Sequence, residues 1–113
     1  MTSPQPTQEQ QEEIQRFNQL LQQLEIIRMN LQQLELEKRD VENALKETKK
    51  LDTSSVIYRS AGRLLFQTNV EEVKSYLEEQ QESIEVKLNS LSSREKKLVS
   101  SVKELQNKLL GKQ

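Results

Sequence analysis

Residues 51–69 read LDTSSVIYRSAGRLLFQTN, and this is the one stretch between the two tails that does not have the pattern of a long helix. It contains two short apolar runs, VIY at 56–58 and LLF at 64–66, with turn-forming residues around them. Short runs of strand-favouring residues between turn formers are typical of a β-hairpin. We therefore predict strands at residues 56–60 and 63–68.

Gly62 is the only glycine between the tails, and it can adopt a positive φ angle without steric cost, as a tight turn requires. The predicted turn is therefore Ala61-Gly62. A lone two-stranded hairpin is at best marginally stable in water, so apolar residues in both strands predict further strands supplied by other chains. The alternative is that the hairpin only caps its own helices. The predicted oligomer interface consists of Val56, Ile57, Tyr58, Leu64, Leu65 and Phe66.

The segment before the hairpin, residues 8–50, has the heptad pattern of a coiled-coil helix. With Phe17 at position a, eight of the ten a and d positions are apolar, and this repeat is sustained over several heptads. The ten positions are Phe17, Leu20, Leu24, Ile27, Leu31, Leu34, Lys38, Val41, Leu45 and Thr48. Short polar side chains at residues 52–55 compete for backbone hydrogen bonds and end the helix.

The segment after the hairpin, residues 70–110, predicts a second helix of similar length. Its d positions are all apolar, namely Val70, Leu77, Ile84, Leu91, Leu98 and Leu105. Asn69 followed by Glu72 has the form of a helix-capping pair, and Gly111 is suited to ending the helix.

Two amphipathic helices joined by a short connection are expected to fold back on each other as an antiparallel pair. Residues whose numbers add to about 120 should then meet, which places Lys38 near Gln81 as one polar layer. The predicted fold class is mainly α: an antiparallel two-helix coiled coil with one β-hairpin, forming a single domain over residues 8–110. Residues 1–7 are predicted to be a disordered tail, and residues 111–113 a short C-terminal tail.

The ends of the two helices opposite the hairpin form a second region of interest. Apolar residues gather at this predicted tip, and an open apolar tip can hold the exposed apolar surface of another protein. The alternative is that these residues only complete the coiled coil. The tip residues are Ile14, Phe17, Leu105, Leu109 and Leu110.

The composition argues against catalysis and against metal or nucleic-acid binding. The chain contains no cysteine and no histidine, which removes thiolate chemistry, the usual general base and the commonest metal ligand. The net charge is −1 and basic residues alternate with acidic ones, so no nucleic-acid-binding surface is predicted. There is no membrane-length apolar run and no secretory signal, so a soluble, cytoplasmic protein without catalytic residues or cofactor is expected.

The long first helix, the segment VIYRSAGRLLFQT and the following NVEEVKSYLEEQQESIEVKLNSLSSREKKL together resemble the β-class subunits of prefoldin. The hairpin is the most specific part: a Val-x-Tyr-Arg strand, a glycine, Leu-Leu with a further strand residue, and an acidic helix start. The likeness covers about residues 8–110. The single hairpin and the short tails resemble the archaeal β subunit more than the eukaryotic subunit 6.

This resemblance implies a hexamer of two α-class and four β-class subunits (α2β4), in which the hairpins oligomerise into a β-barrel platform. It also implies an ATP-independent chaperone, a holdase, that binds non-native proteins at the coiled-coil tips and delivers them to a group II chaperonin. A structural coiled-coil adaptor, or tether, that binds one defined partner is the alternative. A chaperone should suppress the aggregation of several unrelated proteins, whereas a tether should not.

Overall fold

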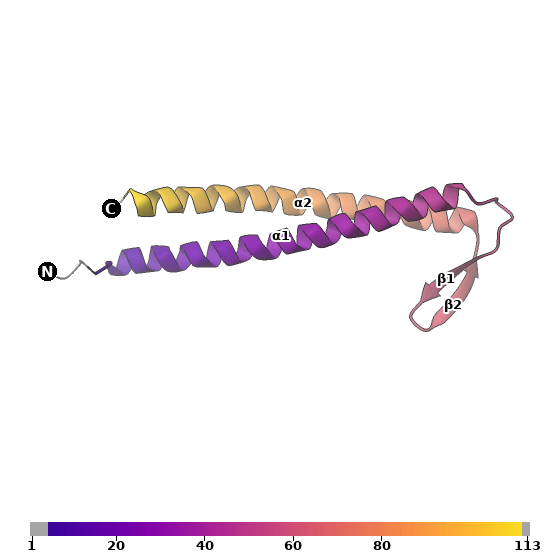
Figure 1. Cartoon of the computed structure of the whole chain (residues 1–113), viewed down its shortest axis with the longest axis horizontal. Helices are drawn as coiled ribbons and strands as arrows, with labels where there is room; N and C mark the ends of the chain where they lie inside the picture. The colour runs from indigo at the N-terminus through magenta and orange to yellow at the C-terminus, as the bar shows by residue number, and fades with distance from the viewer. Residues whose placement is uncertain (1–4, 112–113) are drawn as a thin grey trace. The chain divides into compact units, whose positions relative to one another are not determined.

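A computed structural model of the protein describes residues 5–111, and two long helices joined by a hairpin make up the fold (Figure 1). Helix α1 spans Gln8–Lys49, strand β1 Ile57–Ala61, strand β2 Leu64–Thr68 and helix α2 Val70–Leu110. This arrangement confirms the predicted mainly α fold class with one antiparallel hairpin. Most of the predicted N-terminal tail and the last two residues of the C-terminal tail lie outside the described residues.

Helix α1 begins at a capping box formed by Thr7 and Gln10. The Gln10 backbone N–H donates to Thr7 Oγ1 at 3.1 Å, and the Thr7 N–H donates to Gln10 Oε1 at 2.9 Å. Each side chain thus satisfies a backbone donor that would have no partner inside the helix.

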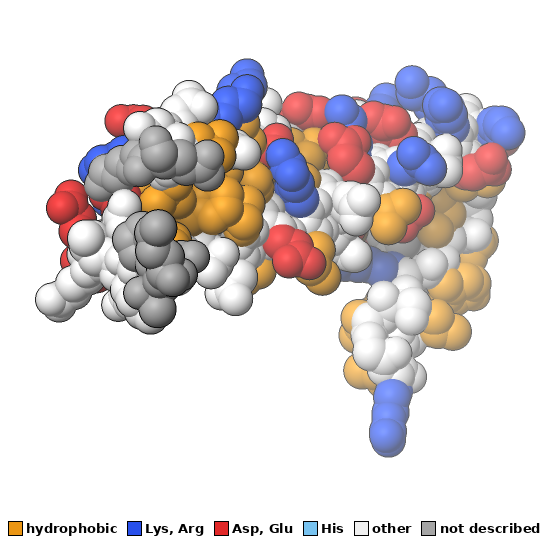
Figure 2. Space-filling model, turned by 60° about the vertical axis from the view of Figure 1, so that its left-hand side comes forward, with side chains coloured by type: hydrophobic (Ala, Val, Ile, Leu, Met, Phe, Trp, Pro, Cys, Tyr) orange, Lys and Arg blue, Asp and Glu red, His pale blue; other side chains and the backbone are white. Residues whose placement is uncertain are grey.

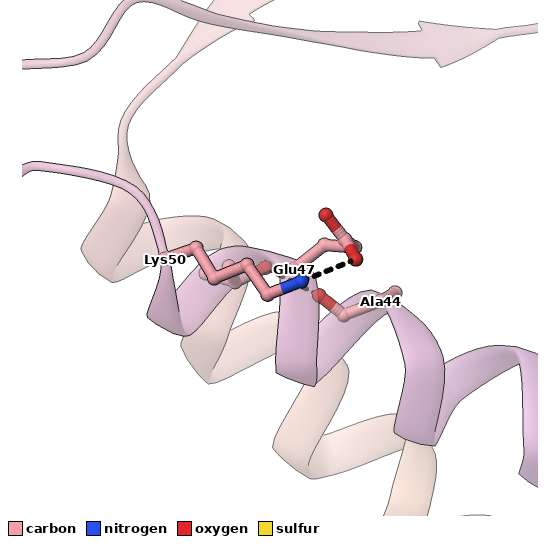
Figure 3. Close-up of polar contacts among 4 residues, drawn as sticks. Ala44, Glu47 and Lys50 are labelled. Carbon is pink, nitrogen blue, oxygen red and sulfur yellow. Dashed lines mark hydrogen bonds and ion pairs between the residues drawn. The ribbon is translucent and has the colours of Figure 1, made fainter.

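The last turns of α1 are held by local polar contacts. The Lys50 ammonium donates to the Glu47 carboxylate at 3.2 Å (Figure 3). Thr48 is one of the predicted a and d positions, which together form the seam along which the helices pack. It is only 6% exposed, and its hydroxyl donates to the Ala44 carbonyl oxygen at 2.7 Å. A polar side chain can therefore occupy the seam here without losing its hydrogen bond.

The hairpin turn lies one residue later than predicted. Ala61 pairs with Leu64, which leaves Gly62 and Arg63 as a two-residue loop. Gly62 has a φ of +61°, and no other residue in the described range 5–111 has a positive φ. A positive φ at the first loop position alone is the pattern of a type II′ turn, whose twist matches that of the flanking strands.

Helix α2 begins at the predicted cap, with one difference. The Glu72 N–H donates to Asn69 Oδ1 at 2.9 Å, as expected for an N-cap. The Glu72 carboxylate accepts a hydrogen bond from the Thr68 hydroxyl at 2.8 Å instead of reaching back to the Asn69 backbone. The same acidic side chain therefore connects the end of β2 to the first turn of α2.

The chain divides into two compact units. The terminal unit comprises residues 1–32 and 90–113, and the hairpin unit comprises residues 33–89. All ten predicted seam positions of α1 are buried or half-buried, and so are the six predicted d positions of α2. The heptad pattern therefore identified the packed faces of both helices.

In the terminal unit, the two helices are antiparallel and joined by two ion pairs. Arg28 Nε lies 3.2 Å from Glu95 Oε2, and Lys108 Nζ lies 3.1 Å from Glu13 Oε1. Leu24 is buried between the helices. The residue numbers of each pair add to about 120, as predicted.

In the hairpin unit, the buried apolar residues are Leu34, Val70, Ile84 and Leu88. Lys38 Nζ lies 2.9 Å from Glu85 Oε1, so its ion-pair partner is Glu85, one turn along α2 from Gln81. The long, flexible lysine side chain can reach the opposite charge from its seam position. The hydrogen bond and the negative charge of Glu85 raise the pKa of Lys38 above its ordinary value.

Candidate functional surfaces

The pairing register assigns the hairpin residues to two faces, because directly opposed residues of antiparallel strands point to the same side. The first face, here called the inner face, carries Ile57, Arg59, Ala61, Leu64, Phe66 and Thr68. The second, the outer face, carries Tyr58, Ser60, Leu65 and Gln67.

The chain's own helix α2 holds part of the inner face. The Arg59 guanidinium carbon lies 4.1 Å from the centre of the Tyr76 ring on α2, a cation–π contact. The Thr68 hydroxyl bonds to Glu72, also on α2. Ile57 and Thr68 are accordingly half-buried. The hairpin is therefore attached to α2 through the end of its inner face that lies nearest the helices.

The rest of the hairpin's apolar surface is uncovered. Leu65 on the outer face is 71% exposed, and Phe66, directly opposite Arg59 on the inner face, is 51% exposed. Val56, Tyr58 and Leu64 are exposed to a similar degree. Within residues 5–111, each strand has only the other as its neighbour, so one edge of each strand is unpaired. Apolar side chains and unpaired backbone edges together form a surface suited to strand addition by another chain.

The terminal unit carries the second apolar surface. Ile14 is 44% exposed and Leu110 is 55% exposed, whereas Phe17, Leu105 and Leu109 are half-buried. Figure 2 shows apolar side chains gathered at the end of the chain where α1 begins and α2 ends. The five predicted tip residues thus combine a partly covered seam with two exposed side chains.

Comparison with known proteins agrees with this architecture. Residues 11–113 match the sequence profile of a family described as "Prefoldin subunit". The prefoldin subunit beta of Methanosarcina acetivorans is 34% identical over 109 residues, which cover 96% of this chain and 92% of the relative. The chain belongs to the prefoldin family.

Two further prefoldin relatives support this assignment. The prefoldin subunit beta of Thermococcus onnurineus is 36% identical over 88 residues, covering 78% of this chain and 76% of the relative. The crystal structure of the prefoldin beta subunit from Thermococcus strain KS-1 matches with a TM-score of 0.87 and 28% identity, covering 96% of each chain. The two-helix, one-hairpin fold is thus the fold of a solved prefoldin beta subunit.

One residue at the tip of this prefoldin chain was missed by the sequence analysis. Glu13 is only 8% exposed, and its carboxylate pairs with Lys108 across the two helices. Extending the heptad one step back from Phe17 places Glu13 at position d, so the signal was available in the sequence. The seam at the tip therefore includes a buried acidic residue.

A second missed feature is a groove of about 370 Å³ in the terminal unit. Ile27, Leu91 and Leu98 contribute apolar side chains, and Arg94 and Lys97 contribute positive charge. Ile26 also lines this groove, and it is 58% exposed because it lies outside the a and d positions. Apolar residues away from the heptad positions are the sequence signal for such exposed surface.

Two kinds of site are absent from residues 5–111. No cluster of three or more His, Cys, Asp or Glu side chains suited to a metal ion occurs among these residues. Neither described helix has a stretch that is long and apolar enough to cross a membrane.

Proposed function

We propose that this chain is a β-class subunit of a prefoldin-type chaperone that holds non-native proteins. The observation that carries this proposal is the combination of a prefoldin beta fold with exposed apolar residues in the hairpin and at the tip. The prefoldin family is a family of chaperones rather than enzymes. The membership of this chain in the family favours the chaperone role over that of a single-partner tether.

Membership of this family implies association with other prefoldin subunits, and the hairpin supplies the surface for it. Five of the six hairpin residues proposed for the interface are exposed in the single chain: Val56, Tyr58, Leu64, Leu65 and Phe66. The sixth, Ile57, is half-buried in the single chain. The proposed assembly is an α2β4 hexamer in which hairpins from neighbouring subunits complete a β-barrel platform.

The proposed client-binding residues lie at the tip: Ile14, Phe17, Leu105, Leu109 and Leu110. Unfolded proteins expose apolar segments, and each tip offers only a small apolar surface, so one contact is weak and reversible. Several tips on one assembly bind the same client together, which raises the overall affinity by multivalency. This suits an ATP-independent holdase in the cytoplasm that must release its client to a group II chaperonin.

The test replaces the two exposed tip residues with serine, as Ile14→Ser together with Leu110→Ser. The matched control changes two apolar residues elsewhere on the helices that are more exposed than the tip pair, Met29→Ser with Val86→Ser, at 62% and 64%. Each variant is assembled with an α-class subunit, and light scattering measures the aggregation of two unrelated heat-denatured enzymes.

The expected result is a clear loss of aggregation suppression for the tip variant and near-normal suppression for the control, with the same assembly mass. Equal loss in both variants would place client binding along the whole helix surface. Undiminished suppression by the tip variant would remove these residues from the proposed site.

A further inference from the structure

We infer that a cavity between the hairpin and the adjoining helix ends is a socket for an apolar side chain from the hairpin of a second copy of this chain. This inference rests on the proposed assembly through the hairpin and adds to it a specific point of attachment.

The socket has a volume of about 270 Å³ and lies entirely within the hairpin unit. Ala44 and Thr48 of α1 line it together with Val73 and Leu77 of α2, and Ile57 of β1 contributes a further wall. These side chains are mostly apolar and half-buried. An apolar group that entered the socket would therefore lose contact with water on several of its sides.

Several polar side chains around the socket have partners within the chain. Arg59 lies over Tyr76, the Thr68 hydroxyl donates to Glu72, and the Thr48 hydroxyl donates to the Ala44 carbonyl. No buried side-chain nitrogen or oxygen among the described residues lacks a hydrogen-bond partner. A charged or strongly polar ligand would have to compete with these contacts to replace the hydrogen bonds of its hydration, whereas an apolar group would not. The socket therefore selects an uncharged apolar group.

The hairpin itself presents such groups. Leu64, Leu65 and Phe66 are consecutive in β2 and more than half exposed. One chain thus carries both the apolar side chains and an apolar socket, with unpaired strand edges beside them. Self-complementary surfaces of this kind bring together like copies, and strand pairing would align the inserted side chain.

The test fills the socket from within the chain by Ala44→Leu, which adds bulk with a residue that favours helices. The control is Ser75→Leu, an exposed position on α2 that is not among the socket-lining residues. Sedimentation velocity of the full chain over a range of concentrations measures self-association, and circular dichroism measures helix content. We expect at least about tenfold weaker association for Ala44→Leu, less than about twofold for Ser75→Leu, and normal helix content for both.

A double-substitution experiment identifies the inserted residue. Leu65→Ala and Phe66→Ala are each measured in the wild-type chain and in Ala44→Leu. The residue that enters the socket should weaken association about tenfold in the wild-type chain and much less once the socket is filled, because the two changes remove the same contact. If Ala44→Leu lowers helix content, Val73→Phe fills the socket from α2 in its place.

The outcomes separate the socket from the broader proposal. Association of the filled variants equal to that of the Ser75→Leu control overturns the socket and leaves the hairpin interface standing. The socket is also overturned if the fold-change in association for each double substitution equals the product of the fold-changes for its two single substitutions. A wild-type chain that stays monomeric at all concentrations overturns self-association through the hairpin, and the socket with it.

Discussion

Ile84 in the helical seam is 5% exposed and Leu65 in the hairpin is 71% exposed, although both are aliphatic side chains of the same size. The seam residue has a matching apolar stripe on the other helix of its own chain. The hairpin residue has no comparable cover among the described residues. The comparison separates two sources of burial: the seam stabilises the single chain, whereas the hairpin residues would need another chain, as proposed above, to gain comparable burial.

The tip combines features of both regions. Phe17, Leu105 and Leu109 continue the seam and are half-buried, whereas Ile14 and Leu110 are exposed like the hairpin residues. Unlike the hairpin, the tip has no unpaired strand edges that could fix a partner in one register. Apolar contact without backbone pairing is non-directional, which suits clients of many sequences.

The largest expected effect is the loss of a seam residue. Ile84→Ala should lower the free energy of unfolding by about 2–4 kcal/mol, because it removes a buried side chain and leaves a cavity. Val86→Ala, two residues away and 64% exposed, should change it by less than about 0.5 kcal/mol. Urea titration followed by circular dichroism measures both at fixed protein concentration. Similar effects at the two positions would remove the distinction between buried seam and exposed helix surface.

The next effect concerns the turn that holds the hairpin in register. Gly62 has a φ of +61°, and a Cβ built there would meet no atom within 4 Å. Gly62→Ala should therefore destabilise the hairpin by about 1–2 kcal/mol through backbone strain alone, without a clash. The expected readout is association weakened about fivefold to thirtyfold in sedimentation experiments, with unchanged helix content.

Asparagine tolerates a positive φ better than alanine, so Gly62→Asn is the matched control and should retain more of the association. If both substitutions leave association at the wild-type level, the ordered turn is not needed for the interface.

A smaller effect of opposite sign is expected at the tip. Glu13 occupies a seam position and is 8% exposed, whereas the Lys108 side chain with which it pairs is 55% exposed. Glu13→Leu should raise the free energy of unfolding by about 1 kcal/mol, because it removes a buried charge and leaves a lysine that water can solvate. Glu12→Leu, at an exposed neighbouring position, is the control and should have little effect. Thermal unfolding measures both, and a lower stability of Glu13→Leu would show that the ion pair outweighs apolar packing there.

The helices and their buried faces could be predicted because heptad burial repeats along one chain and needs no knowledge of distant contacts. Lys38 shows the limit of this reasoning, since its seam position was correct but its ion pair with Glu85 was not predicted. A long charged side chain selects among carboxylates within reach, and the heptad pattern does not rank them. The turn was displaced by one residue because Gly62 can serve at either loop position.

The contacts that orient the hairpin could not be predicted in the same way. The Arg59–Tyr76 contact joins a strand to a helix and depends on the angle at which the chain leaves β2. No spacing rule relates residues 59 and 76. Glu13 is different, because its d position could have been read from the heptad pattern. It was not predicted because the pattern was started at Phe17. The hairpin interface and the tip residues remain predictions, since they concern chains other than this one.

The smallest expected effect comes from the ion pair between Lys38 and Glu85 and appears only at high pH. Because Glu85 raises the pKa of Lys38, folding favours the charged lysine. This contribution is fully present below the unfolded-state pKa of about 10.4 and is lost as the pH rises through the higher folded-state pKa. The two side chains are 32% and 46% exposed, so solvent screens the pair, and the unfolding temperature should differ by at most about two degrees between wild type and Glu85→Gln at pH 8. That difference should shrink as the pH is raised from 8 to above 10.5, because a neutral amine gains nothing from the carboxylate. A difference that stays constant across this range would mean that Glu85 contributes through packing of its side chain and not through the charge of Lys38.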